Sequence, residues 1–105
     1  MPKDIYTPND HCDRAIRTLG DSPWHSELYK VYKAAYFKAL QIAEMSCGSF
    51  LCEDHETHDC RFVLESQEMV SIERRTRQLE SGKHEYFEYS VTVAVSGRCS
   101  CFPKP

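Results

Sequence analysis

Cysteines and histidines gather in the middle of the chain, where five side chains that bind metals well fall within fourteen residues. They are Cys47, Cys52, His55, His58 and Cys60. Thiolate and imidazole are the ligands that Zn²⁺ prefers, and four of them converging tetrahedrally would order a loop of this length. The segment therefore predicts a zinc site, which Cys99 and Cys101 could join. Its spacing contains no C-x₂-C pair and matches no zinc-finger pattern.

The six cysteines also allow two simpler interpretations. They could form three disulfides, in any of fifteen pairing patterns. However, the N-terminus lacks a basic region followed by an apolar run, and without such an export signal we expect mostly reduced, buried thiols. Cys47 would then end a helix face and Cys60 would begin the inward face of a strand. The lack of an export signal and of a membrane-spanning apolar run also predicts a cytoplasmic protein. With reduced thiols it would need no cofactor.

A catalytic site has little support in the sequence. The run Asp10-His11-Cys12-Asp13 contains a nucleophile and a base, but neighbours on a helix point in different directions, and catalytic triads join residues distant in sequence. No nucleophile elbow, phosphate loop or dinucleotide fingerprint occurs. We therefore expect that the protein is not an enzyme.

A second cluster of candidate side chains is basic. Arg74, Arg75 and Arg77 lie close to Tyr86 on a predicted hairpin, and cationic residues beside an aromatic on a sheet can bind single-stranded nucleic acid. Acidic residues interleave with them, at Glu73, Glu80, Glu85 and Glu88. A solvated face with cross-strand ion pairs has the same composition. Nucleic-acid binding is therefore the alternative function, and not the preferred one.

The element that must organise these residues is a long amphipathic helix from Ser22 to Cys47. Ser22 is a plausible N-cap, Pro23 suits the first helical position, and Gly48 supplies the stop. One continuous arc of this helix is apolar, made of Trp24, Leu28, Val31, Tyr32, Ala35, Tyr36, Ala39, Leu40, Ile42 and Ala43. An arc this wide predicts a helix laid across a sheet.

Phe37 breaks the pattern of this helix. It projects from the polar side, among Lys30, Lys33, Gln41 and Glu44. Aromatic residues dominate interface hot spots, so an aromatic on a polar face indicates either a partner or a cover from elsewhere in the chain. A lone exposed aromatic is the simpler alternative. These five residues form the predicted partner-binding surface.

The rest of the chain predicts one α+β domain over residues 1–105. A short first helix begins at Thr7-Pro8 and ends near Gly20. Three antiparallel strands follow the long helix as a meander packed on it, at Cys60–Glu65, Met69–Leu79 and Lys83–Val95. The predicted fold is therefore two N-terminal helices followed by a three-stranded meander.

The alternation of side chains between the two faces of a strand fixes the register of the second hairpin. If Val70 and Ile72 share a face with Val91 and Val93, the turn must contain an even number of residues. A two-residue turn at Ser81-Gly82, with Gly82 at positive φ, places Ile72 opposite Val91 and Val70 opposite Val93. The same register places Thr76 opposite Phe87 and Arg75 opposite Glu88, which is a favourable charge pair.

Composition limits the function classes. A net charge of −3 does not indicate a nucleic-acid binder, and no apolar run approaches the ~20 residues of a membrane span. We therefore expect a soluble module that occupies a partner's surface, as an inhibitor or adaptor, for example a viral or mobile-element protein that blocks a host complex. Self-association is a second use of the same surface. A metal-ordered regulator that uses the Cys/His segment is the competing class.

Overall fold

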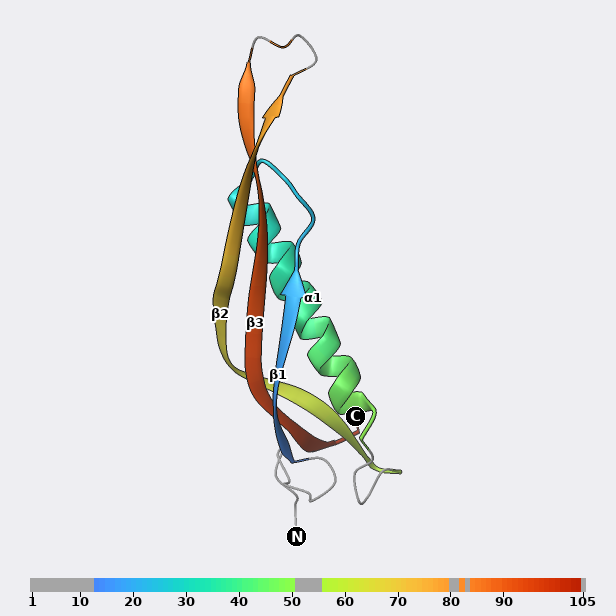
Figure 1. Cartoon of the computed structure of the whole chain (residues 1–105). Coiled ribbons are helices and arrows are strands. Elements are labelled where there is room, and N and C mark those ends of the chain that lie inside the picture. The colour runs from blue at the N-terminus through green and yellow to red at the C-terminus, as the bar shows by residue number, and fades with distance from the viewer. Residues whose placement is uncertain (1–12, 51–55, 80–81, 83, 105) are drawn as a thin grey trace.

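The computed structural model describes residues 13–50, 56–79, 82 and 84–104. The described elements are β1 (Arg14–Asp21), α1 (Leu28–Gly48), β2 (His58–Gln78) and β3 (Glu85–Pro103). The three strands form one antiparallel sheet in the order β1-β3-β2, and α1 covers one face of it (Figure 1). The molecule is elongated, with extents of 70 × 22 × 20 Å, because the β2–β3 hairpin projects beyond the N-terminal end of α1.

The predicted first helix is wrong where it can be checked, because Arg14–Asp21 is strand β1. Ile16, Thr18 and Gly20 pair with β3 residues on the side of α1, and the Thr18 hydroxyl donates to the Ala39 carbonyl at 2.8 Å. Alternate residues of β1 therefore contact the helix, and these contacts decide for a strand although Ala15, Ile16 and Leu19 have a helical spacing. Residues 7–12 of that prediction lie outside the described residues.

The long helix is confirmed over most of its length but begins later than predicted, at Leu28. Ser22 is not its N-cap. Instead the Ser22 N–H donates to the Val91 carbonyl, and the Ser22 hydroxyl accepts the Val91 N–H, both at 2.9 Å. His25 then bridges to Tyr89. The segment before α1 therefore continues the edge of the sheet along β3.

The predicted meander is also wrong, because its first two strands are one strand. β2 runs without a break from His58 to Gln78 and absorbs two extra residues as β-bulges, at Glu65 and Val70. The helix enters the chain between β1 and β2, and β3 lies in the centre of the sheet. The fold is one helix on a three-stranded antiparallel sheet, whose strands lie in the order β1-β3-β2.

The hairpin register is confirmed in part. Ile72 pairs with Val91, Thr76 with Phe87 and Arg75 with Glu88, as predicted. Val93 pairs with Met69 and not with Val70, because the Val70 bulge shifts the ladder by one residue. Gly82 has a φ of 70°, as predicted, whereas the other residues of the predicted turn, Glu80, Ser81 and Lys83, lie outside the described residues.

The core lies between α1 and the central strand. One cluster, which we call the lower core cluster, joins the C-terminal half of α1 to the start of β2 and the C-terminal half of β3. Its members are Ala39, Ala43, Cys47, Cys60, Phe62, Val95, Cys99 and Cys101. The other joins Val31 and Ala35 to Val91 and Val93. The alanines let the helix lie close to the sheet, and a Cβ on Gly20 would collide with the backbone of Ala35 and Ala39. Small residues at this contact therefore fix the position of α1.

Candidate protein-binding surface

Phe37 is 53% exposed on α1. Its ring packs on one side against Tyr36, with centroids 5.7 Å apart, and the Lys33 ammonium lies 5.7 Å from its centroid. The structure therefore places the predicted anchor on the surface of the molecule.

Phe37 is part of a larger surface, which we call the aromatic helix face: Tyr29, Tyr32, Lys33, Tyr36 and Phe37. Tyr32 and Tyr36 stack with centroids 6.4 Å apart and planes at 8°, and both are half-buried. The Lys33 ammonium also lies 6.0 Å from the ring of Tyr29, which is 72% exposed. One cation therefore sits between two exposed rings.

Sequence reasoning missed Tyr29, although a signal was available. Tyr29, Lys33 and Phe37 follow one another at intervals of four residues, which places them along one side of a helix. Tyr32 and Tyr36 were assigned to the buried arc, and the structure buries only part of each ring. The exposed aromatic area therefore exceeds the single side chain that the sequence indicated.

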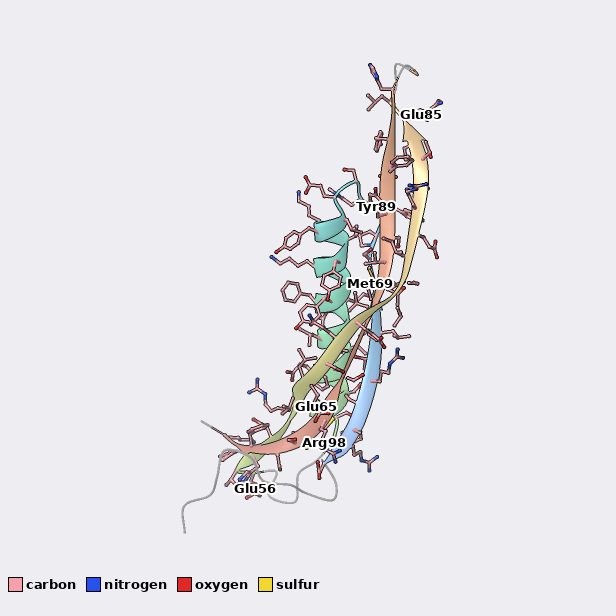
Figure 2. The ribbon with its side chains drawn as sticks, turned by 90° about the vertical axis from the view of Figure 1, so that its left-hand side faces the viewer. Glu56, Glu65, Met69, Glu85, Tyr89 and Arg98 are labelled. Carbon is pink, nitrogen blue, oxygen red and sulfur yellow. A yellow bond between two sulfur atoms is a disulfide. The ribbon has the colours of Figure 1, made fainter. Side chains whose placement is uncertain are left out.

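The other predicted members of the surface divide into two groups. Lys30, Gln41 and Glu44 are all exposed, but they differ in their partners: Lys30 forms an ion pair with Glu27 at 3.2 Å. The Glu44 carboxylate accepts the Phe62 N–H of β2 at 3.5 Å. Glu44 therefore faces the sheet and marks one limit of the aromatic helix face. Figure 2 shows ring side chains standing out from the N-terminal half of α1.

This combination of groups is suited to protein recognition. Exposed tyrosine and phenylalanine rings bury a large apolar area at low cost in conformational entropy, and such residues are enriched among hot spots. A lysine held over ring faces is already oriented for an anionic or carbonyl group on a partner. Nothing in the arrangement activates a nucleophile or a base. The surface can bind, and we derive no reaction from it.

The predicted basic cluster is divided between the two faces of the hairpin. Arg74 pairs with Tyr89 on the α1 side and stacks over the Phe87 ring at 4.4 Å. Arg75 and Arg77 lie on the opposite face, where both contact the Glu88 carboxylate, at 2.9 and 3.5 Å. Arg77 pairs with Tyr86, as a nucleic-acid surface would need, but the single Glu88 carboxylate contacts both arginines on this face and neutralises part of their charge.

The cysteines correct the expectation of free thiols. Cys47 forms a disulfide with Cys99, and Cys60 and Cys101 are disulfide-bonded as well. Sulfur in a disulfide is not the thiolate that Zn²⁺ binds. The described residues contain no group of three metal-binding side chains, and Cys52 and His55 lie outside them.

His58, the remaining member of the predicted metal set, is buried at the start of β2. Its Nδ1 lies 2.9 Å from the Thr57 hydroxyl, and its Nε2 has no hydrogen-bond partner among the described residues. Of the predicted Asp10–Asp13 run, only Asp13 is described, and it forms an ion pair with Arg98 at 3.1 Å.

No protein-family model, curated protein or solved structure matches the chain. The described helix is also not apolar enough to cross a membrane. We therefore infer function from the aromatic helix face and the disulfides.

Proposed function

We propose that the protein is a protein-binding module that recognises its partner through the aromatic helix face. The observation that carries this proposal is the exposed arrangement of Tyr29, Lys33 and Phe37, in which one ammonium group contacts two rings. An exposed apolar surface rimmed by charge is a feature of interaction sites. Lys30 and Gln41 supply part of that polar rim. The module acts as an inhibitor or adaptor by covering a surface of its partner.

We further propose that this binding takes place in an oxidising compartment. The four cysteines that the structure describes are all disulfide-bonded, and disulfides persist mainly in secreted, periplasmic or surface proteins. The sequence predicts a cytoplasmic location with reduced thiols, and the disulfides favour the oxidising compartment as the alternative. The partner would then be a secreted protein or the outer domain of a membrane protein.

A comparison of three proteins tests the function. Tagged wild type, Phe37→Ala and Met45→Ala are incubated with cell surfaces and with culture medium, and the retained proteins are quantified by mass spectrometry. Met45 is the matched control, because it is an apolar side chain on the same helix and is 69% exposed. We expect a partner that Met45→Ala retains and that Phe37→Ala binds more weakly by ~2 kcal/mol or more. Equal retention by both variants would contradict the proposed site.

A further inference from the structure

β2 is an edge strand along its whole length. In the order β1-β3-β2 it pairs only with β3, so its other edge faces no strand of the described chain. From Val63 to Gln78 every residue of β2 is exposed. An unpaired edge of this length presents a row of free backbone donors and acceptors, which readily pair with another strand.

The edge carries an apolar strip on the side of α1, which we call the β2 strip: Leu64, Met69, Val70 and Ile72. These side chains are between 39% and 48% exposed. The helix leaves them open because it packs mainly over β1 and β3 and buries only the start of β2, at Cys60 and Phe62. Figure 2 views the molecule from this edge, with Met69 labelled near its middle.

The part of β2 around Ile72 is acidic on one side and mainly basic on the other. Glu65 and Glu68 precede Ile72, and Glu73 follows it, before Arg74, Arg75 and Arg77. Glu68 and Arg75 both lie on the face away from α1, and each is three ladder positions from Ile72, since the bulge at Val70 absorbs one residue. Two β2 strands that run antiparallel about Ile72 would therefore place each Glu68 opposite an Arg75. A parallel pairing would place like charges together.

We propose that a second copy of this chain pairs with the β2 edge, antiparallel and centred on Ile72. The contact is self-complementary, as a two-fold interface must be. Ile72 meets Ile72 of the other copy, and Met69 and Val70 lie diagonal to it. On the opposite face, two Glu68–Arg75 contacts between the copies join the Arg17–Glu68 and Arg75–Glu88 ion pairs that each copy already holds, at 3.4 and 2.9 Å. The product is a continuous six-stranded sheet with both helices on one side. This inference does not depend on the proposed function, because the aromatic helix face lies on α1 and not at the pairing edge.

Sedimentation of the disulfide-intact chain over a concentration series tests the proposal. We expect a reversible dimer whose dissociation constant rises by ~10-fold or more in Ile72→Lys. Leu19→Lys is the matched control, because Leu19 is also 48% exposed but lies on β1, on the sheet face away from α1. It should leave the dimer unchanged, as should Phe37→Ala. Melting curves of each variant show whether the fold is intact.

A charge exchange tests the register without altering the apolar contact. Glu68→Arg and Arg75→Glu should each weaken the dimer, and the chain carrying both should recover most of the lost affinity, because each reversed pair is again complementary across the two-fold axis. A chain that stays monomeric at the highest concentration attained would overturn the proposal and leave the edge for a strand of another protein. A dimer insensitive to Ile72→Lys and to the exchange would overturn it as well.

Discussion

Cys47, the last buried residue of α1, is joined by a disulfide to Cys99 of β3, 52 positions further along the chain. The bond connects the C-terminal end of the helix to the central strand, within the lower core cluster. It holds the helix against the sheet at the end opposite the projecting hairpin.

Replacing both Cys47 and Cys99 by alanine should lower the free energy of unfolding by about 2–4 kcal/mol, because the unfolded chain regains the freedom that closing a long loop removes. Urea denaturation without reductant measures the change. Non-reducing peptide mapping of the wild type should recover one linked peptide pair that contains both cysteines. An unchanged urea midpoint in the double variant would contradict the stabilising role.

The position of α1 on the sheet depends on Gly20. A Cβ at this position would overlap the backbone of Ala35 and Ala39, which cannot move without displacing the helix. Gly20→Ala should therefore destabilise the protein by about 1–3 kcal/mol or more, as overpacking of a tight contact does. Thermal denaturation gives the measurement.

Gly48→Ala provides the control for Gly20, because a Cβ there meets nothing within 4 Å. Gly48 ends the helix without a positive φ. The Gly48 variant should melt at or slightly above the wild-type temperature, since alanine favours the helix over glycine. If both variants melted alike, the close approach of β1 to α1 would not be a stabilising contact.

The sequence predicted the elements with strong local patterns and failed where tertiary contacts decide. The buried stripe of Val31, Ala35 and Ala39 has a clear helical period, and parity alone paired Ile72 with Val91. The Val70 bulge could not be predicted, because Met69 and Val70 are both apolar and either could face the core.

The first strand and the disulfides show why local reasoning was insufficient. In residues 14–21 the apolar side chains Ala15, Ile16 and Leu19 have a helical spacing. The contacts of Thr18 and Gly20 with α1 nevertheless select the strand. The Cys47–Cys99 pair joins residues far apart in the chain, so only the fold shows that they meet. At the candidate site, Phe37 can be identified from the sequence because it interrupts the polar side of the helix. Tyr29 lies near the start of the helix and interrupts no such pattern.

The ion pair between Asp21 and Lys38 should respond to pH in a defined direction. The Lys38 ammonium donates to the Asp21 carboxylate at 2.9 Å and holds the pKa of that carboxyl below its ordinary value. A lowered pKa means that the interaction is fully present above the ordinary aspartate pKa of about 3.9 and is lost as the pH falls through the folded-state value.

Titration of the Asp21 carboxyl resonance by NMR checks this directly. In Lys38→Met the midpoint should rise toward the ordinary value, because the donor and its positive charge are removed together. A midpoint for Asp21 that does not move would mean that the ion pair does not form in solution.

Phe37 and Phe62 allow one substitution to be compared in two environments. Phe62 is 8% exposed in the lower core cluster, whereas Phe37 is 53% exposed on α1. Phe62→Ala should cost about 3–5 kcal/mol, because it leaves a cavity between α1 and β2. Phe37→Ala removes an exposed ring that contacts Tyr36 and the Lys33 ammonium, so it should cost about 0.5–1 kcal/mol. Urea denaturation of the two variants measures both values, and a cost for Phe37→Ala as large as that for Phe62→Ala would show that Phe37 supports the fold and does not stand free for a partner.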